Sequence, residues 1–222
     1  SMYTYKVAGP QVGIEQEIIR QSCELIGYGS QSNGTFPTGG SMSNYMALVM
    51  ARDAKDPLCK TEGISKPLVV YTSKESHYSN AKNVSFAGIG RNNIRYIQAD
   101  SRGQMIPAKL EEQIIEDLSN GFIPTYVNAT AGTTVLGAFD PIDEIADITE
   151  KYKVWLHVDG AYCGSVIFSD EYKHLVNGIS RSDSFSYNAH KMIGTPMTCS
   201  VILVKDKKHL HDSFSNDADY LY

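Results

Sequence analysis

Short, continuously apolar runs alternate with amphipathic stretches along this chain. A strand covered on both faces carries apolar residues without alternation, whereas a strand with one face in water alternates apolar and polar residues. The pattern therefore predicts βαβ units that build a largely parallel, buried sheet, and the expected fold class is α/β. The predicted strands comprise residues 68–72, 94–97, 126–130, 154–159, 184–187 and 200–204.

Helices are predicted between these runs. Pro107 begins one helix, apolar residues recur in it at i, i+4 and i+8, and Gly121 ends it. A second helix begins with Asp140 as its N-cap and Pro141 in the first helical position, and it ends near Tyr152. A third helix follows the glycine turn at residues 39–40 and runs to about residue 54, whereas residues 213–219 read as a polar loop.

Composition narrows the class of protein. The chain has 222 residues, 42% of them hydrophobic, and no repeat marks a boundary, so residues 1–222 are expected to form one domain. A net charge of −5 with scattered basic residues argues against nucleic acid as a partner. Because no apolar run reaches the roughly 18 residues of a membrane span and no signal sequence is present, we expect no membrane association and a cytoplasmic location.

Metal and disulfide chemistry receive little support. The 4 cysteines are far apart and form no Cys-x-x-Cys pair, which indicates free thiols. The close histidine pair, His209 and His211, lies in a charged stretch, so we expect solvated side chains and no metal site. Ser1 and Met2 resemble the remnant of a tag, which indicates an excised segment.

Polar residues follow several predicted strands, where open α/β sheets bind ligands. The segment Gly39-Gly40-Ser41-Met42-Ser43 offers backbone N–H groups and hydroxyls at a helix start, which suits a phosphate or an ordinary helix cap. His77 follows the strand at residues 68–72 and could stack on a ring, move a proton or serve as a hydrogen-bonded structural residue.

Two ionisable residues follow later strands. Asp159 ends an apolar strand, and a buried carboxylate requires a cationic partner or several donors; a protonated pyridine nitrogen would serve, and a strand-end turn is the alternative. Lys191 follows the strand at residues 184–187. A lone lysine is usually a solvated surface charge, but one that is partly desolvated at a strand end can form a Schiff base with an aldehyde.

These residues together meet the needs of one cofactor, pyridoxal 5'-phosphate. They offer a phosphate cradle, a ring stacker, an acid for the ring nitrogen and an amine for the aldehyde carbon. The motifs of competing enzyme classes are absent from the sequence: no Gly-x-Gly-x-x-Gly opens a helix, and neither a Walker loop nor a Gly-x-Ser-x-Gly elbow occurs.

Six ordered segments carry a family resemblance. They read FPTGGSMSN at 36–44, YTSKESHYS at 71–79, VNATAGTT at 127–134, GAFDP at 137–141, WLHVD at 155–159 and NAHK at 188–191. In this order they resemble the group II pyridoxal-phosphate decarboxylases, and within them the glutamate and cysteine-sulfinate decarboxylase branch. The resemblance runs almost from end to end of the chain.

The resemblance implies a fold and a set of roles. The fold is a fold-type I large domain with a seven-stranded, mostly parallel mixed sheet flanked by helices, in a homodimer whose active sites lie at the subunit boundary. Lys191 would carry the cofactor as a Schiff base, His77 would stack on its ring, and Asp159 would pair with the pyridine nitrogen. Further cofactor contacts would come from Ala161 under the ring, Thr130 near its phenolic side, and Ser41, Met42, Ser43, Asn188 and His190 at the phosphate.

The implied activity is decarboxylation of an amino acid, which releases carbon dioxide and an amine. An acidic substrate, namely glutamate, aspartate or cysteine sulfinate, follows from the branch. An aromatic or other amino acid remains an alternative substrate. Another fold-type I activity, such as that of an aminotransferase or a carbon–carbon lyase, also stays open, and so does a catalytically silent scaffold.

The chain departs from the family in two motifs and in extent. The family has Asp-Ala-Ala-Trp and Asn-Pro-His-Lys where this chain has Gly160 and Ala189, and we expect both changes to alter loop rigidity or substrate preference. Family members also have a Phe-Asn-Gln segment before the matching region, and after a segment like Tyr220-Leu221 they have a mobile catalytic loop and a small domain with a substrate-binding arginine. We therefore expect a large-domain piece truncated at both ends. Alone, this piece is expected to fold or to bind cofactor weakly, without turning over substrate.

Overall fold

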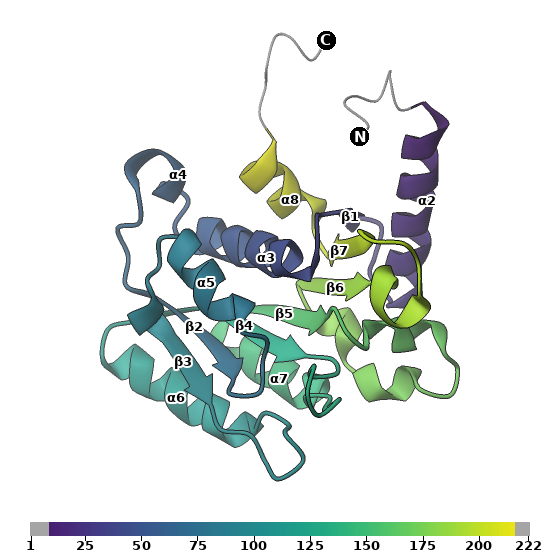
Figure 1. The fold of residues 1–222 in the computed structure, drawn as a ribbon. Helices are drawn as coiled ribbons and strands as arrows, with labels where there is room; N and C mark the ends of the chain where they lie inside the picture. Colours follow the sequence, from purple (N-terminus) through teal and green to yellow (C-terminus); the bar gives the residue numbers. More distant parts are fainter. Residues whose placement is uncertain (1–8, 216–222) are drawn as a thin grey trace.

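The computed structural model describes residues 9–215, which form one seven-stranded sheet with helices on both faces (Figure 1). Ser1, Met2, Tyr220 and Leu221 lie outside the described residues, as do residues 216–219 of the predicted polar loop. Residues 213–214 of that loop are instead the end of a helix, α8. No helix of residues 9–215 is long and apolar enough to cross a membrane.

The sheet is mixed but mostly parallel, as predicted. Its strand order is β1-β7-β6-β5-β4-β2-β3. The strands from β2 to β6 pair in parallel, whereas β7 runs antiparallel to both of its neighbours, β6 and β1. The strands are β1 (Asn33–Thr35), β2 (Leu68–Ser73), β3 (Ile94–Ile97), β4 (Ile123–Thr130), β5 (Trp155–Gly160), β6 (Ser184–Asn188) and β7 (Ser200–Val204).

Helices cover both faces of the sheet. The α-helices are α2 (Pro10–Leu25), α3 (Gly40–Lys55), α4 (Cys59–Glu62), α5 (Ser79–Phe86), α6 (Pro107–Ser119), α7 (Ile142–Tyr152) and α8 (Lys207–Phe214). Short 3₁₀ turns are η1 (Arg91–Asn93), η2 (Gly164–Phe168), η3 (Lys173–Val176) and η4 (Ile179–Arg181), and a π-helical turn, η5 (Ala189–Ile193), follows β6. The helices predicted from residues 39–40 and from Pro107 are confirmed as α3 and α6.

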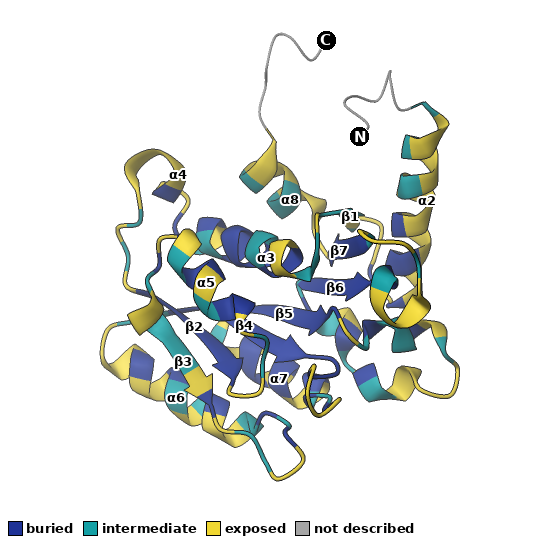
Figure 2. Cartoon of the chain, in the orientation of Figure 1, coloured by how far each residue is buried: buried dark blue, intermediate teal, exposed yellow. Residues whose placement is uncertain are grey.

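Successive strand residues face two separate apolar cores. Val69 and Tyr71 of β2 pack into the core shared with α2, α6 and α7, whereas Leu68 and Val70 pack into the core shared with α3 and α5. Side chains alternate between the two faces of a strand, so a strand buried on both faces needs apolar residues at every position. Figure 2 shows the resulting pattern: the central strands are buried, the edge strand β3 is largely intermediate in exposure, and the helices are buried mainly on the side facing the sheet.

The predicted N-cap of α7 is wrong. The helix begins at Ile142, its N-cap residue is Pro141, and no side chain caps it. The Asp140 carboxylate instead accepts the backbone N–H groups of Met105, at 2.7 Å, and Thr130, at 2.7 Å. Asp140 is therefore buried and links the end of β4 to the loop before α6.

Strand β4 begins earlier than predicted because it accommodates a proline. Val69 of β2 pairs with Pro124, but Val70 pairs with Tyr126, so Thr125 is an extra residue in the ladder. Proline cannot donate a ladder hydrogen bond and is tolerated in a sheet at such bulges. The strand prediction missed residues 123–125 for this reason.

Candidate active site

A cavity of about 220 Å³ lies at the carboxyl ends of β4, β5 and β6, beside the start of α3. Parallel strands place their carboxyl ends along one edge, where open α/β sheets bind ligands. All the predicted site residues line this cavity except Met42 and Ser43. Its lining comprises Gly40, Ser41, Asn44, His77, Tyr78, Thr130, Gly132, Thr134, Asp159, Ala161, Tyr162, Asn188, His190 and Lys191.

Met42 and Ser43 contribute to the turn before α3 rather than to the cavity wall. Their backbone N–H groups donate to the Gly39 carbonyl at 3.0 and 3.1 Å, and the fully buried Ser43 hydroxyl donates to the same oxygen at 3.4 Å. Within residues 9–215 no acceptor lies against the N–H groups of Gly40 and Ser41. The donors available to an anion at this helix start therefore belong to Gly40 and Ser41.

Gly40 lets α3 approach the ends of β5 and β6 closely. A Cβ atom at this position would lie 2.9 Å from Cβ of Ala161 and 3.0 Å from Nδ2 of Asn188. Both distances are shorter than ordinary carbon contacts, so only glycine fits without displacing the cavity wall.

Asp159 is buried, with 4% of its surface exposed, and both of its carboxylate oxygens accept a hydrogen bond. Oδ1 accepts the backbone N–H of Ala161 at 3.0 Å, and Oδ2 accepts the side-chain amide of Asn44 at 2.6 Å. The need for donors that the sequence indicated is met, although the sequence did not identify Asn44. The one indication in the sequence was that Asn44 lies four residues after Gly40, which places both residues on one face of α3.

His77 is held as a neutral imidazole. Its Nδ1 accepts the backbone N–H of Ser79 at 3.2 Å and lies 2.8 Å from the Ser79 hydroxyl, so the proton sits on Nε2. Burial lowers the pKa of His77, Asp159 opposes this effect, and Lys191 and Lys82 add to it. A neutral ring can lie against a flat ligand without bringing a second charge into the cavity.

Lys191 lies at the mouth of the cavity, on the π-helical turn η5. Its ammonium nitrogen is 5.9 Å from the centroid of the Tyr162 ring, and the residue as a whole is exposed. The expectation that Lys191 is partly desolvated stays a prediction, because the Tyr162 ring lies near the head group of an otherwise exposed residue. The amine remains free to react at a ligand in the cavity.

Two buried polar atoms of the cavity wall lack partners among the described residues. They are Oγ1 of Thr130 and Oδ1 of Asn188. Buried polar atoms are nearly always hydrogen-bonded in folded proteins, so such atoms point to a polar ligand. His190 is fixed beside them, since its Nδ1 lies 3.0 Å from both the backbone nitrogen and the carbonyl oxygen of Cys199.

Both departures from the family motifs have local structural consequences, and the expected change in loop rigidity or substrate preference stays a prediction. A Cβ atom on Gly160 would lie 2.6 Å from Cε2 of Phe185 and 2.7 Å from the Ser186 carbonyl oxygen, so this glycine permits tight packing at the end of β5. Ala189 donates its backbone N–H to the Cys199 carbonyl at 2.8 Å, a bond that proline cannot make. Ala189 thus ties η5 to the start of β7.

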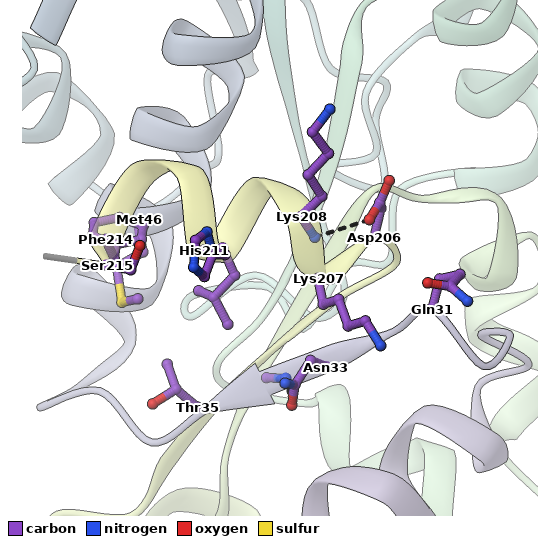
Figure 3. A pocket seen from close by; sticks show the side chains of 12 residues that line it. Gln31, Asn33, Thr35, Met46, Asp206, Lys207, Lys208, His211, Phe214 and Ser215 are labelled. Carbon is purple, nitrogen blue, oxygen red and sulfur yellow. Dashed lines mark hydrogen bonds between the residues drawn. The ribbon is translucent and has the colours of Figure 1, made fainter. Parts of the chain in front are cut away.

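A larger cavity, about 800 Å³ in volume, lies between β1 and α8 (Figure 3). It contains none of the predicted site residues, and its lysines, Lys207 and Lys208, lie on α8, which has no buried residue. No group of three or more histidine, cysteine, aspartate or glutamate residues within residues 9–215 is placed to hold a metal ion. The smaller cavity therefore holds the candidate chemistry.

Comparison with known proteins agrees with this geometry. The pyridoxal-dependent decarboxylase conserved domain matches residues 2–222. The chain is 43% identical over 225 residues to cysteine sulfinic acid decarboxylase of Mus musculus, covering all of this chain and 45% of that protein. It is also 43% identical to an acidic amino acid decarboxylase of Homo sapiens, of which it covers 43%.

Solved structures show the same relationship. The crystal structure of mouse CSAD matches with a TM-score of 0.95 and 43% identity, covering 98% of this chain and 46% of that chain. The structure of Oryza sativa TDC with PLP and tryptamine matches with a TM-score of 0.92 and 29% identity, covering all of this chain and 47% of that one. The chain spans less than half the length of these relatives. It belongs to the pyridoxal-dependent decarboxylase family.

Proposed function

We propose that residues 1–222 form the cofactor-binding large domain of a pyridoxal-phosphate-dependent amino-acid decarboxylase. The reaction would release the α-carboxylate of an acidic amino acid as carbon dioxide and leave an amine. One observation carries the proposal: Lys191, Asp159 and His77, which belong to three separate segments, line a single cavity.

The cavity residues fit the cofactor. Asp159 accepts one hydrogen bond on each oxygen, and its remaining lone pairs can accept the N–H of a protonated pyridine. The His77 ring and the small Ala161 side chain would cover the two faces of the ring, and the unpartnered Thr130 hydroxyl would bond its phenolic oxygen. The Lys191 amine would bind the aldehyde carbon.

The phosphate would lie at the start of α3. The N–H groups of Gly40 and Ser41, which have no acceptor within residues 9–215, lie at the positive end of the α3 dipole, and this end favours binding of an anion. The Ser41 hydroxyl, Asn188 and His190 line the same part of the cavity, while Met42 and Ser43 fix the turn at Gly39. The buried Asn188 oxygen that lacks a partner would accept from a bound water or a ligand hydroxyl.

When bound, pyridoxal phosphate supplies an electron sink for the electron pair that the departing carboxylate leaves behind. The chain's own residues prepare this chemistry. Asp159 holds a proton on the ring nitrogen by its negative charge, neutral His77 keeps the ring in place, and Lys191 provides the amine that a substrate amine replaces.

An acidic substrate is favoured by the relatives. The chain is more similar in sequence to cysteine sulfinic acid decarboxylase and to acidic amino acid decarboxylase than to the rice protein solved with tryptamine. An aromatic substrate is the second candidate, because the rice structure superposes almost as well on this fold. A panel of amino-acid substrates would distinguish decarboxylation of an acidic or an aromatic amino acid from transamination, from carbon–carbon cleavage and from a catalytically silent scaffold.

A cytoplasmic homodimer is also part of the proposal. Its support is the resemblance to homodimeric fold-type I enzymes and the exposure of Lys191 at the cavity mouth, which a second subunit could cover. Sedimentation of the full-length protein tests the dimer, and a monomer at the concentrations that bind cofactor would contradict it. Fractionation of the source cells tests the location.

The central experiment compares two lysine variants of the full-length protein. Lys191→Ala should abolish the visible absorbance of bound pyridoxal phosphate and carbon dioxide release from glutamate, aspartate and cysteine sulfinate. Lys82→Ala is the matched control, because its amine lies nearby, 5.1 Å from the Tyr78 ring, yet outside the cavity lining. Unchanged absorbance in Lys191→Ala would refute the proposed role of Lys191.

A further inference from the structure

A continuous chain of buried side chains leads away from the Asp159 carboxylate. Its links are Trp155 Nε1 to Ser184 Oγ at 2.9 Å, Ser184 Oγ to His157 Nδ1 at 2.9 Å, His157 Nε2 to Asn44 Oδ1 at 3.1 Å, and Asn44 Nδ2 to Asp159 Oδ2 at 2.6 Å. None of the five residues is more than 7% exposed. Water therefore does not compete for these bonds.

The chemistry of each group determines which atom donates and which accepts in this series of hydrogen bonds. An indole N–H can only donate, so Ser184 accepts from Trp155 and has its own proton free for His157 Nδ1. Burial lowers the pKa of His157 to about 4, so the ring is neutral at pH 7 and its single proton sits on Nε2. That proton is donated to Asn44 Oδ1, which turns the Asn44 amide NH₂ toward Asp159.

Hydrogen bonds that run in the opposite direction are unfavourable both at Ser184 and at Asp159. A proton on His157 Nδ1 would make Ser184 accept twice and leave the serine proton without an acceptor in the chain. The Asn44 amide would then present its carbonyl oxygen to the Asp159 carboxylate, where two acceptors repel. The series of hydrogen bonds, ordered in the favourable direction, thus presents the Asn44 amide to Asp159 as a donor.

Within residues 9–215, the groups packed around His157 other than Asp159 carry no charge. The Tyr126 ring from β4 stacks on it with centroids 6.0 Å apart, and burial raises the pKa of that phenol well above its usual value, so it stays neutral. Ser184 from β6 and Asn44 from α3 are uncharged. Asp159 is the charged group whose field reaches His157, and His77 faces Asp159 from the loop after β2.

We propose that Asn44, His157 and Ser184 are positioning residues, which hold Asp159 as an oriented, ionised carboxylate for the pyridine nitrogen of the cofactor. The Asn44 amide donates to Oδ2 at 2.6 Å and leaves the other lone pairs of the carboxylate available to a ligand. The bond also fixes the carboxylate plane, together with the Ala161 N–H on Oδ1. This inference rests on the proposed cofactor, but its first test does not require that cofactor.

The first test is nuclear magnetic resonance on cofactor-free, full-length protein with labelled histidine and aspartate. His157 should show a protonated Nε2 and a bare Nδ1 at pH 7. Ser184→Ala should shift the tautomer toward Nδ1–H, and both Ser184→Ala and Asn44→Ala should move the side-chain carboxyl resonance of Asp159. Ser184→Thr keeps the hydroxyl and should restore both signals.

The second test is the affinity for pyridoxal phosphate. Ser184→Ala and Asn44→Ala should each weaken binding by about tenfold, because the Asp159 carboxylate would no longer be held in a fixed orientation. Ser182→Ala is the matched control, since Ser182 is also fully buried but bonds to the Tyr28 hydroxyl, at 2.7 Å, outside this set of hydrogen bonds. It should leave the His157 tautomer, the Asp159 carboxyl resonance and the cofactor affinity unchanged.

The outcomes separate this inference from the proposed function. Folded Ser184→Ala and Asn44→Ala proteins with an unchanged His157 tautomer and Asp159 carboxyl resonance would overturn the inference, even if Lys191 binds the cofactor as proposed. Conversely, a Lys191→Ala protein that binds pyridoxal phosphate normally would overturn the proposed function, while the tautomer measurement on cofactor-free protein would still stand.

Discussion

Asn44 and Asp159 are 115 residues apart in sequence, yet the Asn44 amide nitrogen lies 2.6 Å from the Asp159 carboxylate. Asn44 belongs to the first turns of α3, and Asp159 belongs to the carboxyl end of β5. The two meet because α3 packs across the sheet with its amino end against the ends of β5 and β6. This approach determines the depth of the cavity and exposes the remaining side of the carboxylate to a ligand.

The first prediction concerns Gly40, which permits that approach. In Gly40→Ala, the new Cβ would lie 2.9 Å from Ala161 Cβ, so the start of α3 should move away from β5. Overpacking of this kind costs about 1–3 kcal/mol of unfolding free energy. Urea unfolding should show that loss, and the affinity for pyridoxal phosphate should fall with it.

A control for Gly40 lies in α2. Gly13→Ala adds a methyl group where, within residues 9–215, no atom outside the neighbouring helix backbone lies within 4 Å, and alanine is the better helix former by about 1 kcal/mol. This variant should be as stable as the parent or more stable. Equal stability of Gly40→Ala and Gly13→Ala would show that the contact at Ala161 is unimportant.

The second prediction concerns Gly160, the last residue of β5. In Gly160→Ala, the Cβ would collide with the Phe185 ring and the Ser186 carbonyl, which should cost about 1–3 kcal/mol of unfolding free energy. The double variant Gly160→Ala with Phe185→Leu should lose less than the sum of the two single losses, because the smaller side chain makes room. Additive losses in denaturant unfolding would argue against this collision.

The third prediction concerns Ala189. Replacement by proline removes the N–H that donates to the Cys199 carbonyl, so η5 should loosen from β7 at a cost of about 1 kcal/mol. Hydrogen exchange should then become faster in residues 190–194. Ala189→Ser keeps the backbone donor and should exchange like the parent, so equal acceleration in both variants would contradict the role of this bond.

The fourth prediction is a pair of opposed pH dependences. Burial lowers the pKa of His157 to about 4, below its ordinary 6.5, so the unfolded chain binds more protons there and stability falls as the pH drops from 6.5 toward 4. Burial raises the pKa of Asp140 from 3.8 to about 6, so the folded state binds more protons and stability falls as the pH rises from 3.8 through 6. The two effects oppose each other over the same range.

Single variants should separate these effects. His157→Gln removes the histidine contribution, so its stability relative to the parent should decrease as the pH rises from 4 to 6. Asp140→Asn removes the aspartate contribution, so its relative stability should increase over that range. Each full effect is on the order of 3 kcal/mol from the size of the shift. Parallel stability curves for both variants and the parent would contradict both assignments.

Much of the fold follows from local sequence. The continuous apolar runs predicted six of the strands, because a strand buried on both faces needs apolar residues at every position. The polar residues after those strands predicted the cavity, because parallel strands bring their carboxyl ends to one edge of the sheet. His77, Asp159 and Lys191 were identifiable in this way before any contact between them was known.

Short and irregular elements escaped prediction for a physical reason. Strand β1 has three residues, one of them glycine, and it forms because β7 offers it an edge. Strand β4 continues through Pro124 because a bulge removes the need for its missing N–H. In each case a neighbouring strand, rather than the local sequence, determines the structure.

The sequence by itself determined the α/β fold, the family and the polar residues that line the cavity, because these depend on local pattern and on ordered motifs. Only the tertiary structure decided that Asn44 and His157 form hydrogen bonds leading to Asp159, that Asp140 links β4 to the loop before α6 instead of capping α7, and that Lys191 is exposed. Hydrogen-bond partners and burial depend on atoms brought together from distant segments. No local stretch of sequence contains that information.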